Sequence, residues 1–186
     1  MQNHLLSFGH GYSAQALGRV LHPLGWQVSG TTRNPDKAKQ MRAEGVEPLL
    51  WENADAIHAA LRSATHVLAS AGPDAQGDPV LRIFGEKIAK RAGQFKWVGY
   101  LSTTGVYGDH QGQWVDESTP LTPSTKRGRA RIAAEAQWQD IPDLGLHIFR
   151  LAGIYGLGRG PFSKVKNGTA RRIIKKNQVF SRIHVE

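Results

Sequence analysis

Hydrophobic positions along the chain follow two alternating periods from the first residues onward. Segment 5–8 is a short apolar run typical of a buried strand, whereas the apolar residues of segment 14–24 recur at i, i+3, i+7 and i+10, as on one face of a helix. This succession repeats along the chain. Further strands are expected at 26–32, 48–51, 66–70, 97–102 and 146–151.

The intervening helices are marked by their capping residues. Asn34 and Asp78 each precede a proline, the combination favoured at the N-cap and first helical position, and Asn53 caps another helix. A looped stretch at 105–123 leads to a helix at 126–138. Strands separated by single helices form a parallel sheet with helices on both faces. The sequence therefore predicts a doubly wound α/β domain, whose ligands bind beyond the carboxyl ends of the strands.

A glycine-rich turn follows the first expected strand. Gly9, Gly11 and Ala14 form the pattern G-x-G-x-x-A, which leads directly into a helix. The first glycine permits the tight turn, the second lets the backbone approach a pyrophosphate, and the helix N-terminus attracts the phosphates. The sequence predicts a dinucleotide site at this turn, formed by Gly9, His10, Gly11, Tyr12 and Ser13.

The end of the second expected strand indicates which dinucleotide binds. An acidic residue there would bind the ribose hydroxyls of NAD, but segment 29–33 holds no carboxylate. Arg33, with Thr32 beside it, is suited to the 2′-phosphate of NADP through charge-assisted hydrogen bonds. NADP is therefore favoured over NAD, the alternative being that Arg33 is a plain surface residue. Ser70 and Ala71 are small residues past which the cofactor can lie.

Two further blocks resemble the extended and atypical short-chain dehydrogenase/reductases, which include NAD(P)-dependent sugar epimerases and dehydratases. The blocks are L-S-T-T-G-V-Y-G at 101–108 and R-L-A-G-I-Y-G at 150–156, with a helix between them. With the glycine turn they follow the family's order along nearly the whole chain. The resemblance implies a Rossmann-fold oxidoreductase, epimerase or dehydratase. In that family a Ser/Thr, a Tyr and a Lys transfer a proton while hydride is exchanged with nicotinamide.

The resemblance assigns one of these three positions and leaves two unmatched. Thr103 falls on the Ser/Thr that binds the substrate oxygen and is the candidate catalytic residue. The family's Y-G-x-x-K pattern, counted back from Glu135, places Arg127 at the tyrosine and Arg131 at the lysine. Arginine stays protonated at physiological pH, so it does not exchange a proton as tyrosine does.

Three interpretations of the helix arginines stay open. In the first, Arg127, Arg129 and Arg131 form an anion clamp for an acidic substrate or for the cofactor's phosphates. The proton is then moved by another residue, for which the candidates are Tyr107, Tyr155 and His10. In the second, the chain is a non-catalytic NADP(H)-binding sensor or scaffold. In the third, the arginines lie on an exposed helix face, with Glu135 continuing the i, i+4 row.

Composition supports a folded protein and narrows its chemistry. The 186 residues are 40% hydrophobic and contain no cysteine, which excludes disulfides and thiolate catalysis. The histidines lack a metal-binding spacing, so no metal site is expected. No apolar run approaches the length of a membrane helix and no targeting segment is visible, so a cytoplasmic protein without a membrane partner is expected.

The net charge of +9 is unevenly distributed. Segment 161–186 holds seven basic residues and one acidic residue. Four of the basic residues are spaced as on one helix face: Arg171, Arg172, Lys175 and Lys176. This spacing indicates a solvated helix face or a surface for an anion. The basic residues lack interleaved aromatics, so no nucleic acid is expected. The expected partner is a small-molecule substrate, for which an anion is a suitable class.

The resemblance also predicts how the chain is divided. Residues 1–160 are expected to form the NAD(P)-binding Rossmann domain. Residues 161–186 are expected to begin a C-terminal substrate-binding region, because family members continue well beyond this point. By this comparison the chain is expected to be truncated, and the full substrate pocket to lie beyond it.

Overall fold

The computed structural model describes residues 2–172, 174 and 179–186. Within residues 2–172, six parallel strands form one sheet in the order β3-β2-β1-β4-β5-β6. Their bounds are β1 (His4–Phe8), β2 (Gln27–Thr32), β3 (Glu47–Leu50), β4 (His66–Ala69), β5 (Trp97–Thr103) and β6 (Leu146–Leu151). The strand order reverses between β1 and β4, so the switch point lies beyond the carboxyl ends of these two strands. The doubly wound α/β fold is confirmed.

The helices begin where the capping residues predict. Their bounds are α1 (Tyr12–Leu21), α2 (Pro35–Ala43), α3 (Ala54–Ser63), α4 (Pro79–Ala89) and α5 (Lys126–Gln139). The side chains of Asn34, Asn53 and Asp78 each accept hydrogen bonds from the first-turn N–H groups of α2, α3 and α4. These bonds satisfy donors that have no partner inside the helix, which fixes where each helix starts.

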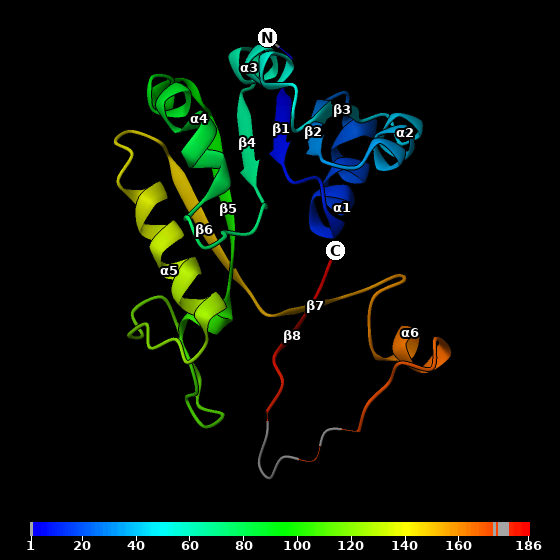
Figure 1. Cartoon of the computed structure of the whole chain (residues 1–186), viewed down its shortest axis with the longest axis vertical. Helices are drawn as coiled ribbons and strands as arrows, with labels where there is room; N and C mark the ends of the chain where they lie inside the picture. Colours follow the sequence, from blue (N-terminus) through cyan, green and yellow to red (C-terminus); the bar gives the residue numbers. More distant parts are fainter. Residues whose placement is uncertain (1, 173, 175–178) are drawn as a thin grey trace.

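Helices cover the sheet in two layers, with α4 and α5 on one side and α1 and α2 on the other (Figure 1). Phe84 of α4 and Trp138 of α5 are fully buried in the larger core, which also includes α3. The smaller core holds Leu5, Val28 and Met41 under α1 and α2. Both faces of the inner strands are therefore buried, as the continuous apolar runs of β1 and β4 require.

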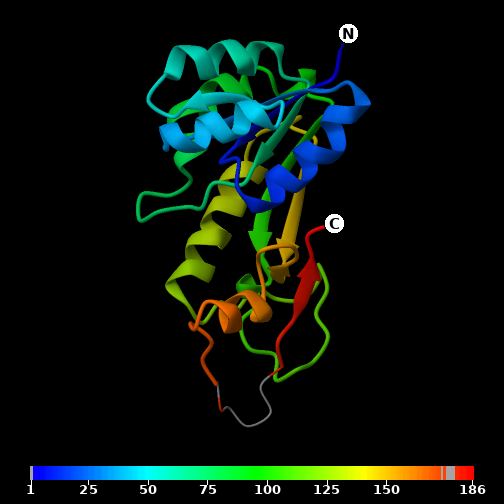
Figure 2. The ribbon, with the colours of Figure 1, turned by 90° about the vertical axis from the view of Figure 1, so that its right-hand side faces the viewer.

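The C-terminal part lies beyond the carboxyl ends of the sheet strands (Figures 1 and 2). It contains β7 (Gly153–Tyr155), which pairs in parallel with β8 (Arg182–His184), and the short helix α6 (Pro161–Lys166). The division into 1–160 and 161–186 stays a prediction. None of the helices in the described part of the chain is long and apolar enough to cross a membrane.

The basic helix expected around 171–176 is wrong where the structure describes it. Arg171, Arg172 and Ile174 are exposed and have no regular secondary structure, while Lys175 and Lys176 lie outside the described residues. The four basic residues are spaced as on a helix face. A short isolated helix, however, needs an apolar face packed against a core, and Ile174 is 81% exposed.

Candidate functional site

The glycine-rich turn connects β1 to α1 and lies at the switch point between β1 and β4. Gly9 has φ of +80°, and a Cβ there would stand 2.9 Å from the backbone nitrogen of Ala71, so glycine is required. A Cβ on Gly11 would meet no atom closer than 3.7 Å, which leaves the approach to the turn open. Helix α1 begins at Tyr12 without a side-chain cap. Its first N–H groups are therefore suited to an anion.

A cavity of about 390 Å³ opens beside this turn, and we call it the turn cavity. It lies where the carboxyl ends of β1 to β4 meet the first turns of α2 and α4. Six of the predicted site residues line it: Gly9, His10, Gly11, Thr32, Arg33 and Ala71. The structure thus brings together residues from the ends of three strands that the sequence placed far apart.

Three other predicted residues do not line the turn cavity. The Tyr12 hydroxyl donates a hydrogen bond to the carbonyl of Leu157, at 3.0 Å, in the C-terminal part. Ser13 lines a different cavity, which is bounded by β8. The Ser70 hydroxyl donates to the carbonyl of Gly9 and so supports the turn from behind. These three side chains therefore lie around the turn and outside the turn cavity.

The His10 backbone lines the cavity, but its side chain points into the protein. Its Nδ1 lies 2.7 Å from the Ser7 hydroxyl, and the side chain packs so closely under β2 that a Cβ on Gly30 would approach it to 2.7 Å. Burial, assisted by the nearby positive charge of Lys37, lowers the pKa of His10 to about 4. This neutral imidazole is fully buried between Gly18 and Gly30, so it is not placed to exchange a proton with a molecule in the turn cavity.

Three cations and one carboxylate surround the turn cavity. Arg33 follows β2, Lys37 lies one turn into α2, and Arg82 lies in α4. The Lys37 ammonium donates to the carbonyl of His10 at 2.5 Å, which ties α2 to the turn. The carboxylate is that of Asp74, in the loop after β4. The cavity is therefore strongly favourable for an anion.

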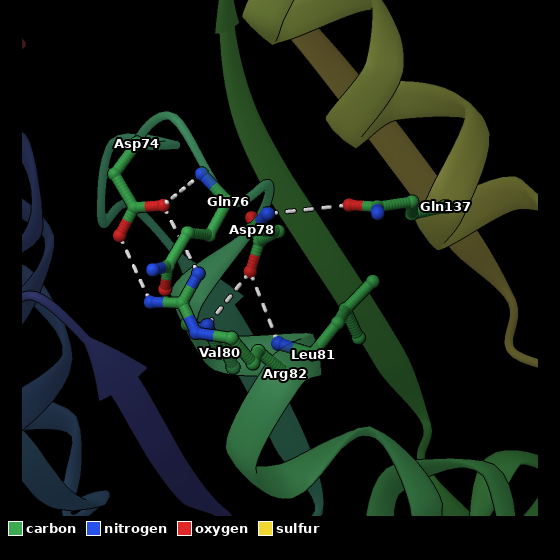
Figure 3. Close-up of polar contacts among 7 residues, drawn as sticks. All are labelled: Asp74, Gln76, Asp78, Val80, Leu81, Arg82 and Gln137. Atoms are coloured by element: carbon green, nitrogen blue, oxygen red, sulfur yellow. Dashed lines mark hydrogen bonds and ion pairs between the residues drawn. The ribbon is translucent and has the colours of Figure 1, made fainter.

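Sequence reasoning did not single out Lys37, Asp74 or Arg82. For Lys37 a signal was present, because it stands in the first turn of a capped helix that starts at the expected 2′-phosphate position. For Asp74 and Arg82 there was none, since eight positions separate them and a loop brings them together. Figure 3 shows this loop beside the start of α4, where Asp78 caps the N–H groups of Val80 and Leu81.

An aromatic side chain lines one side of the turn cavity. Trp51 follows β3 directly and lines the cavity. Its ring meets Phe84 edge to face, with the centroids 5.7 Å apart, so its position is set by the core. A flat apolar surface next to a cluster of cations is the environment that a purine base with a phosphate would need.

Thr103 ends β5 at the same edge of the sheet. Its Oγ1 accepts a hydrogen bond from the N–H of Gly105 at 3.2 Å, and the residue is half-buried. Arg131 lies between this strand and the loop after β4. Its Nη1 donates to the Tyr100 hydroxyl at 2.9 Å and to the Leu101 carbonyl at 2.7 Å, and a Cβ on Gly72 would stand 3.5 Å from its Nη2.

The interpretation of α5 as an exposed arginine face is wrong for Arg131 and Glu135. Arg131 is 7% exposed and Glu135 is 2% exposed, because both lie on the sheet-facing side of the helix with Trp138. Arg127 and Arg129 are exposed, and Arg129 lies close to the carbonyl of Pro123. The three arginines therefore do not converge on one point. Of the three, only Arg131 is buried, and it donates hydrogen bonds to residues of β5.

The two tyrosines that were candidates for proton transfer lie in different surroundings. The Tyr107 hydroxyl accepts a hydrogen bond from Arg150 Nη1 at 3.0 Å. It lines a cavity of about 980 Å³ with Thr104, which follows Thr103 directly. Tyr155 is 41% exposed on β7 and packs edge to face against His184. Tyr107 is thus the one that lies near the predicted substrate-binding threonine.

Comparison with curated proteins finds relatives of the same name in two Escherichia coli strains, K12 and O157:H7. No family model matches the chain. Protein YeeZ from Escherichia coli (strain K12) is 30% identical over 166 residues, a match that covers 82% of this chain and 59% of that protein. The chain therefore spans about three fifths of the length of this relative.

Solved structures share the fold. A functionally unknown conserved protein from Silicibacter pomeroyi DSS is 61% identical, with a TM-score of 0.92 over 99% of this chain and 64% of that one. The UDP-glucuronic acid 4-epimerase from Bacillus cereus, in a complex that contains NAD, is 15% identical, with a TM-score of 0.75 over 98% of this chain and 69% of that one. At this identity the second likeness shows a common fold.

Proposed function

We propose that this chain, which has the Rossmann-type fold of NAD-dependent epimerases and dehydratases, binds NADP(H) in the turn cavity. The observation that carries the proposal is the charge beyond β2. Arg33 and Lys37 line the cavity there, and segment 29–33 holds no carboxylate. The 2′-phosphate is the group that distinguishes NADP from NAD, and two cations are suited to it. The epimerase from Bacillus cereus holds NAD, so this preference rests on the cations alone.

Each part of the dinucleotide has a matching group in the chain. The N–H groups at the start of α1, next to Gly9 and Gly11, suit the pyrophosphate. Trp51 offers the adenine a flat apolar surface, and Arg33 with Lys37 suits the 2′-phosphate. Thr103 then lies toward the nicotinamide end, at the carboxyl edge of β5. The bound cofactor would supply hydride transfer.

The proposed reaction is of the oxidoreductase or epimerase/dehydratase type, on a small molecule. Thr103 would hold the substrate oxygen through its hydroxyl. Arg131 is a fixed positive donor that can stabilise an anionic oxygen, although it does not exchange a proton. Tyr107 is the proposed proton carrier, because it lines the same cavity as Thr104, the residue that follows Thr103.

A sensor that binds NADP(H) without turnover is the second candidate. Two observations favour it: Arg127 is exposed on the surface of α5, and Arg131 already donates to Tyr100 and Leu101. A panel of alcohols, aldehydes and nucleotide sugars separates the two candidates. Turnover changes the absorbance of the nicotinamide band, whereas tight NADPH binding with no change for any substrate supports the sensor.

Replacing Arg33 with alanine tests the cofactor assignment. Titration by NADPH fluorescence is expected to show a loss of affinity of about tenfold or more, because a charge-assisted hydrogen bond to the phosphate is lost. NADH affinity is expected to change by less than about twofold. Arg42→Ala removes the same charge from the exposed last turn of α2 and serves as the control. Equal losses for NADPH and NADH would contradict the assignment.

A further inference from the structure

The Asp74 carboxylate is an unexpected group in a cavity that is proposed to bind an anion. The turn cavity is lined by the cations Arg33, Lys37 and Arg82, and Asp74 is the acidic residue that lines it with them. A negative charge there opposes the binding of any phosphate. Dinucleotide binding alone therefore does not explain why a carboxylate lies in this cavity.

Asp74 and Arg82 form a two-pronged ion pair at the cavity. Arg82 Nη1 lies 3.0 Å from Oδ1 and Nη2 lies 2.8 Å from Oδ2. Figure 3 shows how the two side chains face each other. The two side chains come from separate supports. The Asp74 carboxylate is held by its loop, in which Oδ1 also accepts from the N–H of Gln76 at 2.8 Å. Arg82 stands on α4, whose start is fixed by the Asp78 cap.

This pair is arranged to open without disturbing the core. The Arg82 and Asp74 side chains are 36% and 49% exposed, so a dissolved anion can reach both partners of the pair. The guanidinium presents the same paired N–H groups to a phosphate as to a carboxylate. By contrast, Arg33 makes no hydrogen bond or ion pair within the described residues, so it needs no release.

We propose that Arg82 is a further ligand of the cofactor's 2′-phosphate and that Asp74 is its internal competitor. The carboxylate occupies the guanidinium until a phosphate displaces it, so the pair sets both the affinity for NADP(H) and the discrimination against NAD(H). Binding releases Asp74 to solvent, while Arg82 turns to the phosphate beside Arg33. This inference rests on the proposed NADP(H) site and assigns a specificity-determining residue within it.

Two single variants and their combination test the competition in the full chain. Arg82→Gln is expected to weaken NADPH about tenfold and to change NADH by less than about twofold, because only NADPH carries the 2′-phosphate. Asp74→Asn keeps the acceptor for Gln76 but removes the charge, and is expected to tighten NADPH about threefold or more. In the double variant the gain from Asp74→Asn is expected to vanish, because Arg82 is what it releases.

Matched controls come from the same helix. Glu86 and Lys90 form an exposed ion pair on α4, at 2.6 Å, and neither lines the turn cavity. Glu86→Gln and Lys90→Gln therefore repeat the two charge changes on the same element. Both are expected to keep the wild-type affinity for NADPH and NADH. Arg82→Lys, which keeps the charge but not the paired donors, is expected to give an intermediate loss.

The outcomes separate this inference from the proposed function. If the wild-type protein prefers NADPH but the Asp74→Asn variant does not bind NADPH more tightly, the proposed competition is overturned and the NADP(H) site is left intact. An Arg82→Gln variant that loses NADPH and NADH affinity equally does the same. If the wild-type protein binds NADH as well as NADPH, the proposed cofactor itself falls. The expected pattern in all three variants supports the inference.

Discussion

A single histidine under the glycine turn links the candidate site to the stability of the protein. The imidazole of His10 is fully buried between α1 and β2, and its Nε2 has no hydrogen-bond partner within the described residues. Burial of this ring lowers its pKa to about 4, from an ordinary value of 6.5. The folded protein therefore keeps His10 neutral over a range in which the unfolded chain takes up a proton.

Stability is accordingly expected to fall as the pH falls from about 6.5 toward about 4. In this window the unfolded state binds more protons than the folded state, so acid favours unfolding. For His10 alone the loss between about pH 7.5 and about pH 5.5 is about 1 kcal/mol. His4 and His66, whose pKa values are also lowered by burial, add to it.

Urea denaturation at the two pH values checks this expectation. His10→Asn keeps a polar group near Ser7 but cannot be protonated, so its free energy of unfolding should depend less on pH than that of the wild type. His147→Asn, which alters an exposed histidine of β6, should keep the wild-type dependence. An unchanged pH dependence in His10→Asn would argue against the buried neutral imidazole.

At the residue scale the sequence predicted backbone positions better than side-chain directions. Gly9 and Gly11 were identified because a tight turn requires particular residue types in order. The direction of His10 follows instead from two small residues on other elements, Gly18 and Gly30, which leave room for its ring. The burial of Arg131 was left open although a signal existed: Arg131 is at i, with Ala134 and Trp138 at i+3 and i+7, on the apolar side of α5.

At the element scale, a buried ion pair joins α5 to the edge of the sheet. Arg150 of β6 donates to Glu135 at 2.9 Å, and Ser102 of β5 donates to the same carboxylate. The two charged side chains are 19% and 3% exposed. Each charge therefore depends on the other, since an isolated charge at this depth is costly.

Glu135→Gln is expected to destabilise the protein by about 3 kcal/mol, because it leaves the Arg150 charge without its counter-ion. The double variant Glu135→Gln/Arg150→Met should recover part of that loss by removing the second charge as well. Lys39→Gln, which breaks an exposed ion pair with Asp36, should leave stability nearly unchanged. Free energies of unfolding from urea titrations check the series, and a double variant as unstable as both changes summed would exclude coupling.

The predicted elements match the structure where caps and apolar periods agree. The starts of α2, α3 and α4 were predicted from Asn34, Asn53 and Asp78, because a cap fixes a helix by local hydrogen bonds. The strands β7 and β8 were not predicted. Each has three residues, and their pairing joins segments that lie nearly thirty positions apart, so no local pattern indicates it.

At the scale of the whole molecule, the net charge of +9 has two locations. Several cations line the turn cavity, whereas those of the C-terminal part, such as Arg171 and Arg172, are exposed and outside regular structure. A ligand that binds the turn cavity joins α1, α2, α4 and four strand ends. Such a ligand should therefore stabilise the domain against global unfolding.

Saturation with NADPH is expected to raise the melting temperature by several degrees. A ligand that binds only the folded state at 100 times its Kd adds about 2.7 kcal/mol to the free energy of unfolding. NADH at the same concentration should add less, because it lacks the 2′-phosphate. Differential scanning calorimetry checks both values, and a larger shift with NADH would reverse the proposed preference.

The packing of His10 against Gly30 and Gly18 has a consequence for evolutionary covariation. A Cβ on Gly30 would lie 2.7 Å from the His10 side chain, so these two sites cannot enlarge independently. Among homologous chains, a larger residue at position 30 should therefore be accompanied by a smaller one at position 10. The residue at position 10, the variable second position of the glycine-rich turn, would then depend on the size of the residue at position 30 of β2. Its identity would not indicate which nucleotide binds.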